Sequence, residues 1–467
     1  MATCHVSIFT KVSILCLCFS TSSSSSQTTF TLSLTQHIPV PSQELPEETN
    51  QHPYLRTINY LVSSSLARVR RLKNLNDSSS ASISQVPLFA QGSDDGYYSV
   101  FLTFGSPSQN LSYFMDTGSS LVWFPCTSQY KCSDCPTSGV YPNKTTVFMP
   151  QLSSSAKILG CNDEKCQLVR ASTPGIILCS SKKNCYYEQG YAIGNTSGLL
   201  LSETLHFPEG DVTDFAVGCS TSSTRPPLGL VGFGRGRESL PAQMGLKKFS
   251  YCLVSHQFDD DETVSSELVL VRGSSNSGAG EGGIRYTKFR KNPAFFNEYY
   301  YLNLRNITVG GTRVEIPYGF LVPQSDGNGG TIIDSGTTFT TMDEPIYNLV
   351  AKEFENQMSM YNRDTYVESQ SGFPLCFDIK GKKPVYPELM FHFKGGAKLS
   401  LPMADNFVQV GEAACMTIVS IGLDSSIGPS IIIGNYQQQD IYMEYDLENG
   451  YGRLGFKKED LQIKKPE

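Results

Sequence analysis

Two short segments of this 467-residue chain share one pattern of residue types. Asp116 follows Phe-Met and precedes Thr-Gly-Ser-Ser, and Asp334 follows Ile-Ile and precedes Ser-Gly-Thr-Thr. Burying a carboxylate at the end of an apolar strand is costly unless hydrogen bonds or proton sharing compensate for it. The hydroxyl residues supply donors, and Gly118 and Gly336 permit a sharp turn and close backbone approach. The pattern therefore predicts two loops that each hold one carboxylate in a fixed position.

Two such loops that meet across a cleft define a specific chemistry. Carboxylates that lie close together cannot both ionise easily, so Asp116 and Asp334 are expected to share one proton. One then takes a proton from a bound water while the other protonates a peptide carbonyl. Paired aspartates are known to act in this way. We expect peptide hydrolysis at acid pH without a covalent intermediate.

The likeness between the two halves extends beyond the aspartates. The triplet Leu230-Val231-Gly232 ends 116 residues after Asp116, and Ile432-Ile433-Gly434 ends 100 residues after Asp334. A repeat of this length indicates two related lobes, each contributing one loop with one carboxylate.

The segments around these loops favour short strands. Tyr97–Phe104 is rich in β-branched and aromatic residues, and Leu111–Met115 resumes after a Gly-Ser-Pro-Ser turn, so a hairpin is expected to lead into Asp116. Further strands are expected at Ile284–Phe289 and Tyr299–Val309, and a helix at Pro345–Met358.

These signals predict an all-β fold of two similar lobes with a central cleft. A chain of this length can form two cores. The first lobe is expected at residues 91–272 and the second at 284–467, joined by a Ser/Gly-rich linker at 273–283.

Composition excludes several classes of function. The formal net charge of −7 argues against a nucleic-acid partner, and no apolar run is long enough to predict a membrane span. Beyond residue 90, histidine occurs only at His206, His256 and His392, and we find neither an HExxH nor a GxSxG motif. Serine, cysteine and zinc mechanisms are therefore poorly supported, and no metal or other cofactor is expected.

The first 90 residues differ from the rest of the chain. Residues 1–25 combine Lys11, the apolar stretch Val12–Phe19 and small polar residues, which predicts a secretory signal peptide. Residues 26–90 contain a basic stretch with an apolar stripe at helical spacing, Leu66–Leu75. It is either a surface helix or part of a removable prosegment whose cations cover an acidic cleft and loosen as carboxylates protonate.

The cysteines favour an oxidising compartment. Three of the fourteen lie in residues 1–25, and seven of the other eleven lie between Cys126 and Cys185. Disulfides are favoured over zinc, because the pair Cys132 and Cys135 has no second ligand pair at finger-like spacing. Secretion to the extracellular space or cell wall is expected, with the vacuole as an alternative. N-glycosylation triplets occur at Asn76, Asn110, Asn143, Asn195 and Asn306.

At these motifs the chain resembles the pepsin-like aspartic peptidases, in particular the plant nepenthesin-like branch, over about residues 92–457. The resemblance implies a bilobal fold and a monomer that binds a polypeptide substrate in its cleft. Asp116 and Asp334 correspond to the catalytic pair, and Thr117 and Ser335 to residues that brace the facing loops. Substrate-binding positions are implied at Thr117, Gly118, Tyr191, Gly336 and Thr337.

The resemblance also predicts a flap over the cleft. Tyr191 matches the flap tyrosine and Trp123 the tryptophan behind it, although Ala192 stands where the family usually has glycine. The branch often has a cysteine after the final strand, but Gly452–Glu467 has none. One cysteine is therefore expected to remain as a thiol or to pair between chains, or the C-terminus is altered.

Two other functions are compatible with parts of the pattern. Some plant proteins of this fold are non-catalytic inhibitors of glycosidases that have lost the active-site pattern. A glycosidase also uses two carboxylates, but without symmetric Asp-hydroxyl-Gly loops. The intact Asp116 and Asp334 loops favour the peptidase.

Overall fold

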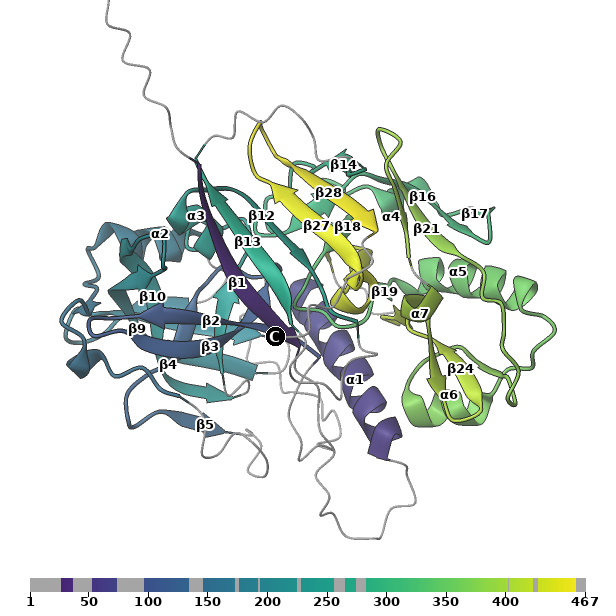
Figure 1. The fold of residues 1–467 in the computed structure, drawn as a ribbon, viewed down its shortest axis with the longest axis horizontal. Coiled ribbons are helices and arrows are strands. Elements are labelled where there is room, and N and C mark those ends of the chain that lie inside the picture. The colour runs from purple at the N-terminus through teal and green to yellow at the C-terminus, as the bar shows by residue number, and fades with distance from the viewer. Residues whose placement is uncertain are drawn as a thin grey trace, which may run out of the picture.

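The computed structural model describes residues 27–36, 53–73, 96–133, 146–172, 176–191, 194–224, 228–255, 265–273, 283–401, 403–422 and 427–458. Strands dominate this part of the chain, and a few helices lie at its edges and between its halves (Figure 1). The predicted signal peptide and almost all of the predicted linker lie outside the described residues.

The first lobe is a twisted sheet that ends in the Asp116 loop. β2 (Tyr98–Phe104) and β3 (Gln109–Asp116) form the predicted hairpin, and β11 (Gly229–Gly232) runs parallel to β3. In this register Gly232 lies opposite Asp116. The other strands of the lobe are β4 (Trp123–Pro125), β5 (Lys131–Ser133), β6 (Lys157–Ile158), β7 (Ile176–Cys179), β8 (Cys185–Tyr191), β9 (Gly194–His206) and β10 (Val212–Thr224).

The second lobe repeats this arrangement around Asp334. β18 (Thr331–Ile333) runs parallel to β26 (Ile431–Ile433), with β15 (Tyr300–Leu302) and β19 (Thr341–Met342) antiparallel beside them. The two sequence triplets thus lie beside the strands that carry the aspartates. The lobe also contains β16 (Leu304–Val309), β17 (Thr312–Val314), β20 (Cys376–Asp378), β21 (Leu389–Phe393), β22 (Lys398–Ser400), β23 (Phe407–Val410), β24 (Ala413–Met416) and β25 (Val419–Ser420).

A continuous sheet joins the two halves. Its order is β14 (Arg285–Lys288), β28 (Arg453–Lys458), β27 (Ile441–Asp446), β12 (Leu246–Cys252), β13 (Ser266–Arg272), β1 (Thr28–Gln36) and then β2. β1 comes from the N-terminal segment that precedes both lobes, and Thr28 pairs with Arg272. This segment therefore forms part of the core sheet, a role that its sequence did not predict.

The long helix α1 (Pro53–Lys73) lies between the two lobes (Figure 1). Proline is tolerated in a first helical turn, and basic residues in the last turn interact favourably with the negative end of the helix dipole. The helix includes most of the predicted Leu66–Leu75 stripe, but it begins earlier. Val62 packs with Phe339 and Phe373 of the second lobe, and Val69 packs in a further cluster of that lobe, so α1 is no free surface helix.

The remaining helices are short, apart from α5 (Glu344–Gln357), which matches the predicted helix within one residue at each end. The others are α2 (Glu164–Ser172), α3 (Leu240–Met244), α4 (Tyr318–Leu321), α6 (Thr365–Ser371), α7 (Met403–Asn406) and the 3-10 turns η1 (Pro150–Leu152) and η3 (Asn435–Gln438).

Disulfides fix both lobes. Cys126–Cys219 joins the end of β4 to β10, and Cys376–Cys415 joins β20 to β24. Two more bonds hold the cysteine-rich insertion of the first lobe, Cys161–Cys179 and Cys166–Cys185. Cys132 is also disulfide-bonded, which supports disulfide over zinc for the CxxC pair. Cys252 lies buried at the end of β12.

Candidate active site

The loop after β3 holds the Asp116 carboxylate with two donors. The backbone N–H of Gly118 donates to Oδ1 at 2.9 Å, and the Ser119 hydroxyl donates to Oδ2 at 2.6 Å. Asp116 is only 2% exposed, so these bonds replace solvent at both carboxylate oxygens.

The loop after β18 holds Asp334 in the same way. The N–H of Gly336 donates to Oδ1 at 3.0 Å, and the Thr337 hydroxyl donates to Oδ2 at 2.6 Å. The sequence repeat is therefore also a repeat of hydrogen bonds.

Reciprocal bonds join the two loops. The Ser335 N–H donates to Thr117 Oγ1 at 2.8 Å, and the Thr117 N–H donates to Ser335 Oγ at 3.1 Å. The Ser335 hydroxyl also donates to the carbonyl of Met115 at 3.1 Å. Thr117 is fully buried, and its side chain braces the two loops.

Each loop glycine packs against the aspartate of the other loop. A Cβ added to Gly118 would lie 2.6 Å from Asp334 Oδ1, and one added to Gly336 would overlap Asp116 Oδ1. Only glycine permits this approach. The two carboxylates therefore lie close together across the interface between the lobes.

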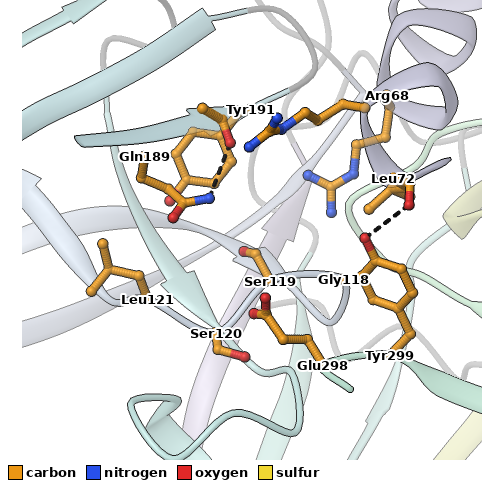
Figure 2. A pocket seen from close by; sticks show the side chains of 12 residues that line it. Arg68, Leu72, Gly118, Ser119, Ser120, Leu121, Gln189, Tyr191, Glu298 and Tyr299 are labelled. Atoms are coloured by element: carbon orange, nitrogen blue, oxygen red, sulfur yellow. Dashed lines mark hydrogen bonds between the residues drawn. The ribbon is translucent and has the colours of Figure 1, made fainter. Parts of the chain in front are cut away.

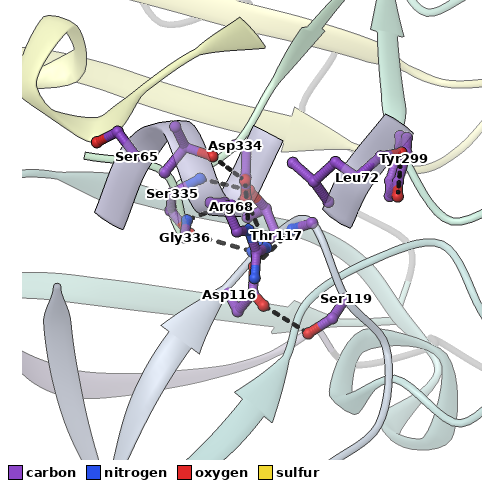
Figure 3. Close-up of polar contacts among 12 residues, drawn as sticks. Ser65, Arg68, Leu72, Asp116, Thr117, Ser119, Tyr299, Asp334, Ser335 and Gly336 are labelled. Atoms are coloured by element: carbon purple, nitrogen blue, oxygen red, sulfur yellow. Dashed lines mark hydrogen bonds and ion pairs between the residues drawn. The ribbon is translucent and has the colours of Figure 1, made fainter. Parts of the chain in front are cut away.

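A cation from α1 bridges the pair. Arg68 Nη2 lies 2.5 Å from Asp116 Oδ1, and Arg68 Nε lies 3.2 Å from Asp334 Oδ2 (Figure 3). All three side chains are buried. The guanidinium thus lies between the two carboxylates and contacts both.

The charges in this cluster shift one another's protonation. Burial opposes the charge of Arg68, but Asp116 and Asp334 overcome this effect and raise its pKa well above the ordinary value. Burial also raises the pKa of Asp334, and this effect outweighs the lowering by Arg68. The negative charge of Asp116 raises the Asp334 pKa further, as expected for neighbouring carboxylates.

Comparison with known proteins places this geometry in a family. The family model described as "Xylanase inhibitor N-terminal" matches residues 98–270, and "Xylanase inhibitor C-terminal" matches residues 299–458. Aspartic proteinase nepenthesin-2 of Nepenthes gracilis is 35% identical over 390 residues, covering 81% of each chain. Nepenthesin-1 of the same plant is 34% identical, covering 76% of each chain. The chain belongs to the plant nepenthesin-like branch of the pepsin-like aspartic proteases.

Solved structures confirm the pepsin-like fold. Basic 7S globulin from soybean has a TM-score of 0.58 at 18% identity, covering 79% of this chain and 94% of the globulin. Conglutin gamma from lupine seeds has the same TM-score and identity, covering 77% of this chain and 91% of the conglutin. At this identity the similarity concerns the fold alone.

Tyr191, which the resemblance predicts as the flap tyrosine, lies at the end of the hairpin of β8 and β9. Tyr191 pairs with Gly194 at its end, and its ring centroid lies 6.3 Å from that of Trp123. Burial raises the pKa of Tyr191 well above its ordinary value. Ala192, the predicted departure from the family pattern, lies outside the described residues. Asn195 lies exposed near the tip of this hairpin, where it pairs with Gly190.

Several residues around the carboxylate pair were not predicted from the sequence. The Tyr299 hydroxyl donates to the carbonyl of Leu72 at 3.1 Å, and Lys73 forms an ion pair with Asp343, so the end of α1 is held to the second lobe. Glu298 also lines the cleft, although no sequence motif marks it. One sequence feature could have indicated Glu298: it directly precedes a run of aromatic residues that favours a buried strand. A glutamate is rarely buried beside such a strand unless its carboxylate is paired.

Within the described ranges, no group of three His, Cys, Asp or Glu side chains is arranged to hold a metal ion. Within the same residues, no helix is both long and apolar enough to span a bilayer.

Proposed function

We propose that this protein is an aspartic-type endopeptidase that hydrolyses peptide bonds at acid pH. Asp116 and Asp334 share one proton and hold the attacking water between them. One carboxylate takes a proton from the water as its oxygen attacks the peptide carbonyl, and the other gives its proton to the carbonyl oxygen. The tetrahedral intermediate then collapses with proton transfer to the leaving amine.

One observation carries this proposal. Both carboxylates keep two donors each in matched loops, and both contact the same guanidinium, that of Arg68. A scaffold that served only to bind another protein would not need two buried carboxylates in this symmetric arrangement. An extended polypeptide, bound through its backbone beneath the β8–β9 hairpin, suits the cleft between the lobes.

We also propose that the chain is secreted as an inactive precursor. Residues 1–25 act as the signal peptide and 26–90 as a prosegment that is removed on activation. Arg68 lowers the pKa of Asp334, so it binds preferentially to the ionised pair. Docking of α1 therefore weakens as pH falls and the carboxylates take up protons. The four disulfides of the described residues support passage through an oxidising compartment, either to the cell exterior or to the vacuole.

A second candidate is a non-catalytic protein that inhibits glycosidases. The two family models that match this chain are named after xylanase inhibitors, which favours this candidate. The intact pair of Asp116 and Asp334 favours the peptidase instead.

The deciding experiment is cleavage of a denatured protein by the acid-treated, secreted chain from about pH 2 to about pH 8, with and without pepstatin. Pepstatin contains a statine group that mimics the tetrahedral intermediate. Cleavage that is confined to acid and blocked by pepstatin supports the peptidase. A folded chain that cleaves nothing, as judged against an Asp116→Asn control, favours the inhibitor.

A further inference from the structure

The main chain of the two aspartates is held in different ways. The first loop borders a cavity between α1 and the β8–β9 hairpin (Figure 2), and the backbone N–H of Phe233 donates to the Asp116 carbonyl at 2.7 Å. In the second loop a side chain donates to the Asp334 carbonyl, the amide Nε2 of Gln438, at 3.3 Å. Every residue except proline carries a backbone N–H, but few carry a side-chain amide. This contact of the second aspartate therefore depends on the identity of one residue.

The Gln438 side chain has one defined orientation. It belongs to η3 and is fully buried. Its Nε2 also donates to the Ile433 carbonyl at 3.1 Å, and its Oε1 accepts from the Tyr251 hydroxyl at 2.6 Å. An amide nitrogen carries two donors, and this orientation uses both of them. The Tyr251 hydroxyl therefore fixes which way the amide faces.

A second tyrosine extends these contacts to the other loop. The hydroxyl oxygens of Tyr251 and Tyr445 lie 3.0 Å apart, on the adjacent strands β12 and β27. The Thr117 side chain is a further hydrogen-bonding neighbour of Tyr445. Tyr251 gives its one proton to Gln438, so it accepts from Tyr445, which in turn accepts from Thr117. The contacts thus run in one direction, from the first loop to the Asp334 carbonyl of the second.

These side chains keep the same hydrogen-bonding roles across the acid range. Burial raises the pKa of Tyr251 and that of Tyr445 above the ordinary tyrosine value, so both hydroxyls keep their protons. A glutamine does not titrate. Tyr251 is 1% exposed, and Tyr445 and Gln438 are fully buried, so water cannot easily replace a lost partner.

We propose that Gln438, Tyr251 and Tyr445 are positioning residues that fix the separation of the two aspartate loops. They act through Thr117 and the Asp334 main chain. The inference rests on the proposed endopeptidase function and adds to it the residues that keep its carboxylate pair in place. A displacement of about 1 Å at a reacting group can cost about 100-fold in rate, so a proton-sharing pair tolerates little movement.

The separation of the carboxylates also determines the pH range of activity. Two carboxylates close together have apparent pKa values that are pushed apart, and the state with one shared proton exists between these values. If the loops move apart, the higher value falls, and the upper limb of the pH profile moves to lower pH. Besides each other, the carboxylates face the charged or titratable groups of Arg68, Glu298, Tyr191, Tyr299 and Tyr251.

Among these groups, Arg68 leaves with α1, and the others are neutral at acid pH. The pKa of Glu298 is raised to about 8, chiefly by burial, and burial raises the pKa of each of the three tyrosines. The upper limb of the activated enzyme therefore reports on the aspartate pair itself.

The test compares kcat, KM and the pH profile of kcat/KM on one peptide substrate, using the full secreted chain after acid activation. Gln438→Met keeps a similar volume but loses every hydrogen bond of the amide. We expect kcat to fall about 10- to 100-fold while KM changes less than about twofold. The upper limb should move down by roughly 0.5 to 1 pH unit. Tyr251→Phe should change both quantities in the same direction, by less.

Gln438→Glu separates the hydrogen bonds from the packing. A protonated glutamate can still accept from Tyr251 and donate once towards the Asp334 carbonyl, so kcat near the acid optimum should stay within about threefold of the wild type. As pH rises, this carboxyl ionises, loses its donor and repels Asp334. Activity should therefore fall at lower pH than in the wild type.

The neighbouring glutamine provides a matched control. Gln437 is equally buried and uses the same atoms: Nε2 donates to the Asp405 carbonyl at 2.7 Å and the Thr417 hydroxyl at 3.0 Å, and Oε1 accepts from the Thr340 N–H at 2.7 Å. These partners lie outside the hydrogen bonds that hold the two carboxylates. Gln437→Met should therefore lower Tm about as much as Gln438→Met, but leave kcat within about twofold and the upper limb in place.

The outcomes separate the two proposals. Equal kcat and equal upper limbs for Gln438→Met and Gln437→Met overturn the positioning role and leave the peptidase intact. A Gln438→Glu variant no more active at acid pH than Gln438→Met also overturns it. If Gln438→Met does not fold, Tyr251→Phe decides the question against Tyr98→Phe, which removes a hydroxyl bonded to the Val254 carbonyl at 2.7 Å. Failure of the wild-type chain to cleave any peptide overturns the peptidase, and the positioning role with it.

Discussion

The two aspartate loops make the same internal hydrogen bonds but have different surroundings. Thr337, the outer donor of the second loop, is fully buried. Two residues later the loop contacts α1, because the Phe339 N–H donates to Ser65 Oγ at 3.1 Å. Ser119, the equivalent donor of the first loop, is only partly buried and lines the cavity with Glu298. The second loop is thus covered by α1, whereas the first opens onto a cavity.

This difference separates the carboxylate pair from its surroundings. The proposed chemistry needs a symmetric pair, because each carboxylate must act as acid or base against the same water. The surroundings need no symmetry, and the cavity lies next to only one loop. The helix α1 contacts both regions: Arg68 binds the symmetric carboxylate pair, and Arg71 lines the cavity beside the first loop.

The strongest test of the symmetric part is to remove one charge at a time. Asp116→Asn and Asp334→Asn should each reduce turnover by roughly 10⁴-fold, because neither remaining carboxylate can be acid and base in one step. Measurement of kcat on a peptide substrate, with near-ultraviolet circular dichroism to check folding, tests this. If either purified variant kept substantial cleavage, the two loops would not act as a pair.

Removal of the Arg68 cation tests whether its contact with the two carboxylates holds α1 in place. Arg68→Met leaves two carboxylates buried without their partner, which should lower the free energy of unfolding of the full chain by about 3–5 kcal/mol near neutral pH. The loss should shrink as pH falls, because protonation removes the uncompensated charge. Pepstatin should then bind the uncleaved variant near neutral pH, whereas docked α1 should exclude it from the wild type.

Arg70→Met is the matched control for this change. Arg70 lies on the same helix but is exposed, so its loss should alter neither stability nor pepstatin binding measurably. Equal effects of the two substitutions would show that helix charge, and not the Arg68 contact, holds α1 in place.

Local features of the site could be predicted from the sequence, but its long-range contacts could not. Nearby residue types predict the Asp116 loop and its hairpin. The repeat within the sequence predicts the triplet that ends at Gly232, which forms the parallel strand beside Asp116. In contrast, β1 pairs Thr28 with Arg272, and no local pattern chooses a strand partner that far along the chain. The same limit explains why α1 was predicted only over its last turns, since its first half is buried by Phe339 and Phe373.

The buried acids Glu238 and Glu298 illustrate this limit most clearly. Glu238 and Glu298 are separated by a lobe boundary in sequence, and each alone resembles an ordinary surface glutamate. Only the fold brings both to Ser120 and buries them. A carboxylate pair assembled in this way has no sequence motif, unlike the two Asp-hydroxyl-Gly loops.

Glu298, the buried acid beside the first loop, should also change how the free energy of unfolding depends on pH. The pKa of Glu298 is raised to about 8 by burial and by Glu238, whereas an unfolded glutamate titrates near its ordinary value. Its contribution to stability is thus fully present at acid pH and is lost as pH rises through about 8. Glu298→Gln, which cannot ionise, should stabilise the full chain by about 2–4 kcal/mol near pH 8 and change little near pH 4.

Denaturant unfolding at both pH values measures this difference. Glu203→Gln serves as the control, since its carboxylate is held by two serine hydroxyls and should not become stabilising when neutralised. Equal stability of wild type and Glu298→Gln at both pH values would mean that Glu298 is ionised and already compensated while α1 is docked.

The smallest effect should come from the glycines that let the two loops approach. Gly336→Ala places a methyl group against Asp116 and should cost about 1–3 kcal/mol of stability, because the facing carboxylate must move. Gly160→Ala is the control, since its added Cβ would have only the Lys183 carbonyl oxygen nearby, at 3.8 Å. Gly118→Ala should behave like Gly336→Ala, as its Cβ meets Asp334 in the same way. Thermal unfolding of the three variants compares the two loops directly. Similar losses of stability at Gly118 and Gly336 would show that the two loops are symmetric in packing as well as in hydrogen bonding. A loss at Gly336 alone would mean that the first loop can relax into the open cavity beside it.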